Sequence, residues 1–229
     1  MNRFVFKIIA AATMFIDHFG LILLDDSTLL YSIFRIIGRV SFVMFAYMIA
    51  EGFFKTKDIK EYLLRLGLAA IILEGFIIIY YFISDVNMIL SFNILWTLFA
   101  GLISLYLFYN KNNYLKILVL PIVIVSELFF SYGSYGVLMI IFFGMYQSKV
   151  KAMISVFFLN LIYITYPLAY FIQGYQFARL PVEQWFSLGA IVFIFLYNGL
   201  TGKYKLKWFF YLFYPGHLLL LYLIDILRS

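Results

Sequence analysis

The chain of 229 residues contains no cysteine, which excludes disulfide bonds and thiolate chemistry from its fold and function. Charged residues are scarce as well: they form 12% of the chain, whereas 66% of the residues are hydrophobic. A soluble protein of this length needs many more charged side chains to cover its surface. The composition therefore excludes a soluble globular protein and predicts an integral membrane protein.

Apolar runs long enough to cross a bilayer recur along the whole sequence, and short alternating strands typical of a barrel are not seen. We therefore predict an all-α polytopic bundle of about nine transmembrane spans, with a range of about eight to ten. No internal repeat or soluble segment interrupts it, so a single transmembrane domain over residues 1–229 is expected. The first five expected spans are 4–24, 30–54, 62–83, 92–109 and 114–130. The sixth follows a turn at 131–136 and ends at 146. The last three are 153–172, 184–197 and 207–227.

Basic residues mark alternate ends of these expected spans. They cluster at 3–7, 55–60, 111–116, 149–151 and 203–207, whereas acids such as Asp25, Asp26 and Asp85 mark the opposite ends. Because cytoplasmic loops of membrane proteins carry an excess of lysine and arginine, the N-terminus is predicted to be cytoplasmic. We expect a multi-pass protein of the cell membrane, in bacteria the inner or plasma membrane. Basic flanks also explain the net charge of +6, so membrane lipids, and no nucleic acid, are the expected partners.

The chain has two histidines, and both lie inside apolar segments: His18 follows Asp17 in the first span, and His217 lies in the last. With a rise of ~1.5 Å per residue, His18 lies ~20 Å from the start of its span and His217 ~15 Å along the last span. The two imidazoles are therefore expected at similar depth. An ionisable residue inside a span is costly and indicates a functional site. The alternative is that both are packing histidines, satisfied by backbone groups or by tyrosine.

Arg35 and Arg39 are four residues apart, so they share one face of the second span. Adjacent residues on a helix point about 100° apart, so Asp17 can pair with Arg35 or Arg39 without contacting His18. A histidine with an acid nearby is the commonest general base near neutral pH. No pattern of metal ligands, phosphate-binding loop or serine nucleophile elbow is visible, so no metal site is predicted. Further candidate residues for substrate binding are polar or aromatic and lie within or beside the spans: Lys7, Glu51, Glu74, Asn93, Glu127, Tyr132, Asn198 and Tyr214.

Several segments occur in an order that resembles the TraX family, membrane proteins named for the protein that N-acetylates conjugative pilin. They are KIIAAATMFIDHFG, IGRVSFVMFAYMIAEGFFKT, EYLLRLG, NILWTL, SYGSYGV, LYNGLTG and FFYLFYPGHLLLLYLI. The resemblance covers nearly the whole chain, and its most specific parts are the DH pair, the GR…EGF.KT pattern and YPxHL. Ser131 departs from the family, in which an acid is expected before that YG.

The resemblance implies a membrane acetyltransferase or acyltransferase. It would move an acyl group from cytosolic acetyl-CoA, or another acyl-CoA, to an amine or hydroxyl of a peptide, sugar or lipid acceptor. Acetyl-CoA would be a substrate, and no permanently bound cofactor is expected. In one branch of related acyltransferases a basic residue precedes the catalytic histidine with ten residues between them, and Lys7 and His18 have that spacing.

Residue roles follow from the same resemblance. His18 would act as the general base or carry the acetyl group transiently, and Asp17 would orient a partner or stabilise an imidazolium. Arg39, together with Arg35, would balance negative charge or hold the acceptor, and His217 would line the same cavity.

Two other classes stay open. A proton-coupled transporter would relay protons through Asp17, His18 and buried acids such as Glu74 and Glu127. That class predicts inverted repeats or paired broken helices, which the sequence does not show convincingly. A scaffold subunit would not need His18 at all. The acceptor, the acyl length and the oligomeric state are not specified by the sequence.

Overall fold

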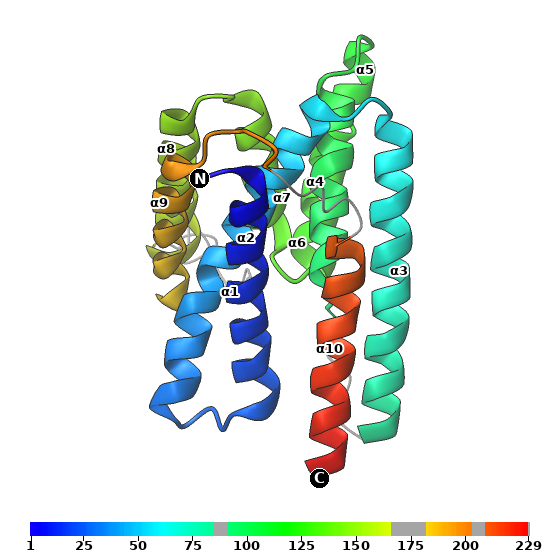
Figure 1. Ribbon diagram of the computed structural model, residues 1–229. Helices are drawn as coiled ribbons and strands as arrows, with labels where there is room; N and C mark the ends of the chain where they lie inside the picture. Colours follow the sequence, from blue (N-terminus) through cyan, green and yellow to red (C-terminus); the bar gives the residue numbers. More distant parts are fainter. Residues whose placement is uncertain (85–90, 166–181, 203–208, 229) are drawn as a thin grey trace. The chain divides into compact units, whose positions relative to one another are not determined.

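The computed structural model describes residues 1–84, 91–165, 182–202 and 209–228, and the regular structure in these ranges is helical (Figure 1). One isolated bridge pairs Phe92 with Phe130. The predicted all-α class is therefore confirmed. The elements are α1 Arg3–Leu23, α2 Leu29–Lys55, α3 Ile59–Ser84, α4 Ile94–Phe108, α5 Asn113–Lys116, α6 Val119–Phe129, α7 Gly133–Met145, α8 Lys149–Asn160, the π-helix η1 Leu161–Thr165, the 3-10 helix η3 Val182–Leu188, α9 Gly189–Leu196 and α10 Phe209–Arg228.

Within the described ranges, three helices are long and apolar enough to cross a membrane, namely α1, α2 and α3. Shorter apolar helices cover Ile94–Phe108, Gly133–Met145 and Val182–Leu196. Large apolar side chains also point outward along α3, where Phe82 is 89% exposed and Leu64 61% exposed. Such a surface is unfavourable in water and suits lipid chains. The chain is thus a helical membrane protein, whereas the count of about nine spans stays a prediction.

The chain divides into two compact units. The first unit comprises Met1–Phe45, Ile79–Val86 and Pro181–Ser229, and the second comprises Ala46–Ile78 and Asn87–Leu180. The first unit therefore holds α1, the first part of α2, α9 and α10. The second unit holds the end of α2, most of α3, and α4 to α8.

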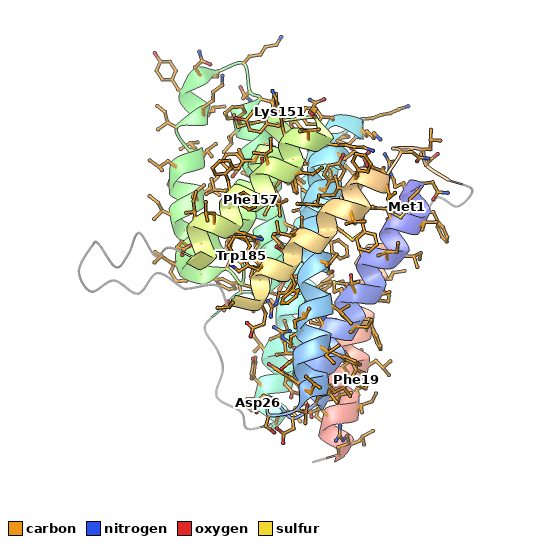
Figure 2. All side chains as sticks on the ribbon, turned by 90° about the vertical axis from the view of Figure 1, so that its left-hand side faces the viewer. Met1, Phe19, Asp26, Lys151, Phe157 and Trp185 are labelled. Carbon is orange, nitrogen blue, oxygen red and sulfur yellow. The ribbon has the colours of Figure 1, made fainter. Side chains whose placement is uncertain are left out.

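In the first unit, α1 and α10 lie side by side and run in the same direction (Figure 1). Met1 and Asp26 lie toward opposite ends of α1 (Figure 2). The N-terminus is fixed by the segment after α9, because the Met1 ammonium donates to the Leu196 carbonyl at 2.7 Å and Asn198 N–H donates to the Met1 carbonyl at 2.9 Å. The start of α1 is capped by the Asn2 side chain, which accepts from Val5 N–H.

Two glycines allow close packing in the second unit. A Cβ at Gly101 would meet Ile140, and a Cβ at Gly144 would meet Leu105, so α4 and α7 approach closely at two points along their length. Ala100 of α4 packs with Val137 and Ile141 of α7 in the buried core beside these contacts. The absence of a side chain at these two positions therefore allows the close approach of the two helices.

The helix expected over 114–130 is not continuous. The structure breaks it into α5, which ends at Lys116, and α6, which begins at Val119. Pro121 then occupies the first turn of α6. An N–H at this position has no acceptor within the helix, so the proline costs no helical hydrogen bond. The expected span at 153–172 is described only as α8 and η1, and the remainder of that span lies outside the described residues, as does the expected start of the last span at 207.

Loop residues fix the ends of the long helices. The Asp58 side chain accepts from Glu61 N–H at 3.0 Å and so caps the start of α3. Between α1 and α2, the backbone N–H and the hydroxyl of Ser27 donate to the Asp25 carboxylate, and these bonds lower the pKa of Asp25 from its ordinary value. Asp25 stays exposed in this turn.

Candidate functional site

The two histidines meet in the first unit. His18 Nδ1 lies 2.7 Å from His217 Nε2, and the rings stack with their centroids 5.0 Å apart and an interplanar angle of 15°. The predicted match in depth is therefore confirmed: parallel helices bring residues 18 and 217 to one level. His217 Nδ1 in turn lies 2.7 Å from the carbonyl oxygen of Phe213, one turn earlier on α10.

These distances fix the protons of the pair when both rings are neutral. A carbonyl oxygen only accepts, so His217 Nδ1 must carry a proton and donate it to Phe213. His217 Nε2 is then an acceptor, and His18 Nδ1 must donate to it. A neutral imidazole carries one proton, so His18 Nε2 keeps a free lone pair. The arrangement leaves the basic nitrogen of the pair at His18 Nε2.

Nothing in the described part of the chain occupies that nitrogen. His18 Nε2 makes no hydrogen bond to a described residue and is not among the fully enclosed polar atoms left without a partner. His18 is half-buried, whereas His217 is only 5% exposed. Tyr214 packs its ring edge against both imidazoles, with centroids 5.7 Å from His18 and 5.4 Å from His217. Tyr214, a predicted site residue, therefore lies at the pair.

Asp17 pairs with the neighbouring helix, away from the histidines. Arg35 Nη1 of α2 donates to Asp17 Oδ1 at 2.7 Å, and both side chains are mostly buried. Gly38 makes this possible, because a Cβ at position 38 would overlap the Cβ and carboxyl of Asp17. Ser41 donates to the Ala10 carbonyl at 3.0 Å and ties α2 to α1 further along the pair of helices. Of the two arginine partners left open by the sequence, the structure selects Arg35.

Arg39 follows one turn after Arg35 on α2 and is only 8% exposed. Its Nε is enclosed and has no hydrogen-bond partner. Asp17 is the carboxylate within electrostatic range of Arg39 and is already bonded to Arg35. The first unit thus contains a buried guanidinium beside an ion pair that is complete without it.

The remaining predicted residues of the first unit lie elsewhere. Asn198 is part of the turn that holds Met1, because its side-chain oxygen accepts from Leu200 N–H and its own N–H donates to Met1. Lys7 shares the face of α1 with His18 but lies three turns earlier, ~16 Å along the helix. The structure therefore does not bring Asn198 or Lys7 to the histidine pair.

Five predicted residues belong to the second unit, and their contacts are helix caps, a charge pair and a ring contact. Glu74 accepts from the backbone N–H and the side-chain amide of Asn93, which itself caps α4. Glu51 pairs with Lys55 one turn later at 2.6 Å. Tyr132 is the residue before α7 and stacks on Tyr135. Their role in ligand binding stays a prediction.

A partly buried polar cluster in the second unit was not predicted from the sequence. Glu127 accepts from the backbone N–H of Ser134 at 2.8 Å and from its hydroxyl, which also lies 2.5 Å from the Tyr163 hydroxyl. Gly133 adopts a left-handed conformation with φ of 49° directly against the Glu127 carboxylate, so that α7 begins with an acid at its positive end. The SYGSYG turn was visible in the sequence, but its pairing with Glu127 had no sequence signal.

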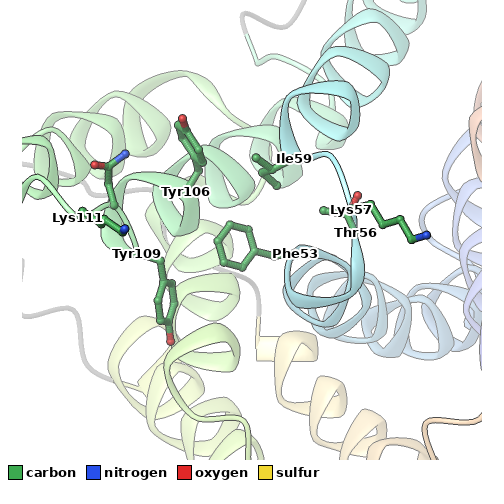
Figure 3. Close-up of a pocket in the computed structure, with 8 residues that line it drawn as sticks. Phe53, Thr56, Lys57, Ile59, Tyr106, Tyr109 and Lys111 are labelled. Atoms are coloured by element: carbon green, nitrogen blue, oxygen red, sulfur yellow. The ribbon is translucent and has the colours of Figure 1, made fainter.

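The second unit also contains a cavity of about 510 Å³ where α2 ends, α3 begins and α4 ends (Figure 3). Phe53, Tyr106 and Tyr109 supply aromatic rings, and Lys57 and Lys111 lie on opposite sides of it. Neither lysine forms an ion pair with a described residue. Tyr109 donates its hydroxyl to the Gly144 carbonyl at 3.0 Å, which fixes that wall of the cavity.

Comparison with known families gives one match that spans the chain. The family model described as TraX protein matches residues 2–225. The chain belongs to the TraX family. The predicted resemblance is thereby confirmed, and its three most specific motifs can be placed: the DH pair lies on α1, GR on α2 and YPGH on α10. In this TraX-family chain, all three contribute side chains to the first unit.

The chain is similar to the probable fimbrial assembly protein FimC, serogroup H1, from Dichelobacter nodosus. This relative is 27% identical to this TraX-family chain over 233 residues, covering 96% of the chain and 94% of the relative. No solved structure matches the chain.

Proposed function

We propose that this TraX-family protein is a membrane acyltransferase that uses His18 Nε2 as a general base. The donor is cytosolic acetyl-CoA or another acyl-CoA, and the acceptor is an amine or hydroxyl of an exported peptide, a sugar or a lipid. The single observation that carries this proposal is the hydrogen-bond chain from His18 through His217 to the Phe213 carbonyl. It supports a basic nitrogen held in one orientation and free to meet a substrate.

The proposed reaction uses the lone pair of His18 Nε2. His18 Nε2 takes a proton from the acceptor amine or hydroxyl as its nitrogen or oxygen attacks the thioester carbonyl. The carbon–sulfur bond breaks, and the leaving thiolate takes the proton back from the His18 imidazolium. The products are the acylated acceptor and free CoA, so protons and electrons balance. His217 is a positioning residue in this scheme, because it holds His18 Nδ1–H without contacting the substrate.

The basic ends of the helices suit a donor that arrives from the cytoplasm. With the N-terminus inside and about nine spans, the loops at 55–60 and 111 face the cytoplasm, as does the cavity that Lys57 and Lys111 flank. Aromatic rings and unpaired ammonium groups are the chemistry that a purine nucleotide with phosphates needs. We assign the nucleotide end of the acyl-CoA to this cavity.

A proton relay is less well supported. A relay needs titratable groups on both sides of the histidine pair, but His217 Nδ1 donates to a backbone carbonyl that cannot pass a proton on.

A role in fimbrial assembly, as the name of the relative states, fits an acyltransferase whose acceptor is an exported pilin. That acceptor would place the product outside the cell.

The proposal is tested by mass spectrometry of exported peptides and surface polymers from host cells. Three strains are compared: one with the wild-type gene, one without the gene, and one with His18→Gln. An added acyl group that requires both the gene and His18 is the expected result. Identical products from the wild-type and His18→Gln strains, with equal amounts of protein in the membrane, would reject His18 as the base.

A further inference from the structure

Arg39 carries a buried charge that the described part of the chain leaves without a partner. Its residue is 8% exposed, and its Nε is enclosed without a hydrogen bond. Arg35, one turn earlier, is neutralised by Asp17 through a bond of 2.7 Å. With neutral histidines, the group formed by Asp17, Arg35 and Arg39 keeps one excess positive charge.

The other acids that the structure describes do not supply the missing charge. The sequence has 11 aspartate and glutamate residues, and no described one forms a salt bridge with Arg39. Asp85 lies outside the described residues. The rest have other partners or lie exposed: Asp17 with Arg35, Glu51 with Lys55, Glu61 with Arg65, Glu74 with Asn93, Glu127 with Ser134, Asp58 at the start of α3, Asp225 with Tyr80, and Asp25, Asp26 and Glu183 at the surface.

An isolated guanidinium inside an apolar helix bundle is costly, and buried charges normally pair with an opposite charge. A buried arginine to which the described residues offer no free acid is stabilised most when a ligand brings a negative group. Guanidinium presents its donors as a planar fork that matches the two oxygens of a carboxylate or phosphate.

We propose that Arg39 binds the anionic oxygens of a carboxylate or phosphate group on a substrate. The substrate class is thereby narrowed to molecules that carry such a group. This inference rests on the proposed function only in calling the ligand a substrate, because anion binding at Arg39 does not require acyl transfer. The bond between Arg35 and Asp17 fixes α2 one turn before Arg39, so the point from which the Arg39 side chain extends is set before the anion arrives.

The test measures thermal unfolding of the purified protein in detergent, with inorganic phosphate or acetate replacing chloride at constant ionic strength. The wild-type protein should unfold about 5 °C higher with saturating phosphate or acetate than with chloride. Arg39→Met should lose this shift. It should also unfold in chloride at or above the wild-type temperature, because an uncompensated charge has been removed. Lys116→Gln removes an exposed charge and should behave as the wild type does.

Each other outcome overturns the inference. An anion shift that survives in Arg39→Met places the anion elsewhere, and no shift in the wild type means that no such site exists. If Arg39→Met fails to fold or unfolds at a lower temperature in chloride, Arg39 serves the fold. Arg39→Lys keeps the charge without the fork and should keep less than half of the shift. His18→Gln should keep the anion shift while losing acyl transfer, so the failure of the two proposals can be told apart.

Discussion

Replacing His217 tests the proton arrangement of the histidine pair. In His217→Leu, His18 Nδ1–H loses the acceptor that lies 2.7 Å away in the wild-type protein. Leaving a buried donor without a partner costs about 1–3 kcal/mol. The His18 tautomer and ring orientation that keep Nε2 basic are destabilised by the same free energy, and their population falls accordingly. Since about 1.4 kcal/mol corresponds to a factor of ten, kcat should fall about 5- to 150-fold.

Glutamine at the same position provides the informative comparison. Its side-chain carbonyl oxygen can reach the place of the imidazole Nε2 and accept from His18 Nδ1–H. His217→Gln should therefore retain kcat within about 5-fold of the wild type, by recovering about 1 kcal/mol or more of the lost hydrogen bond. KM for the donor should change little in either variant, because His217 does not contact the substrate in this scheme.

The assay is the initial rate of radiolabelled acetyl transfer from acetyl-CoA by protein reconstituted in liposomes, with thermal unfolding measured on the same samples. Tyr222→Phe, further along α10, controls for changes on this helix and should keep wild-type kinetics. Nitrogen-15 NMR of labelled histidine should report His18 protonated at Nδ1 in the wild type. Equal kcat values for the leucine and glutamine variants, or a wild-type kcat in His217→Leu, would mean that His217 does not hold His18 in its catalytic tautomer.

Three further predictions concern Gly38, the Asp17–Arg35 ion pair and the two lysines of the cavity. Gly38→Ala places a methyl group against the Asp17 side chain and should lower the free energy of unfolding by about 1–3 kcal/mol, measured by thermal unfolding in detergent. Asp17→Asn leaves Arg35 buried without its counter-ion and should cost about 3–5 kcal/mol by the same measurement, whereas Asp17→Asn with Arg35→Gln should recover part of this loss. Replacing both Lys57 and Lys111 by alanine should raise KM for acetyl-CoA about tenfold, through loss of about 1.4 kcal/mol of phosphate attraction, with kcat unchanged.

An unchanged unfolding temperature in Gly38→Ala would mean that α2 is not held against Asp17 at that point. A double variant at Asp17 and Arg35 less stable than Asp17→Asn alone would mean that the pair is not an isolated ion pair. If the lysine double variant binds acetyl-CoA as the wild type does, the nucleotide end of the donor lies elsewhere.

Local patterns predicted the long helices well. The first three were expected within about three residues of their ends, because apolar length and polar flanks specify them. The break between α5 and α6 was missed, since a proline inside an apolar run fits both the middle of a kinked span and the first turn of a new helix.

The meeting of the histidines was predictable because helical rise converts sequence position into depth. The partner of Asp17 was not, because Arg35 and Arg39 share one face, and the choice depends on where Gly38 lets the helices approach. The bond from His217 to the Phe213 carbonyl and the pairing of Glu127 with Ser134 depend on side-chain rotamers and on a left-handed Gly133. Residue spacing carries no information on either feature.

Catalysis of acyl transfer by His18 can be measured by following the acyl group itself. Proteoliposomes containing wild-type protein or His18→Gln receive radiolabelled acetyl-CoA together with an envelope extract from host cells that lack the protein. We expect label in the acceptor fraction with the wild type and at least a 100-fold lower rate with His18→Gln, which corresponds to about 2.7 kcal/mol of transition-state stabilisation. Equal rates of labelling by the two proteins, at equal folded amounts, would contradict this expectation.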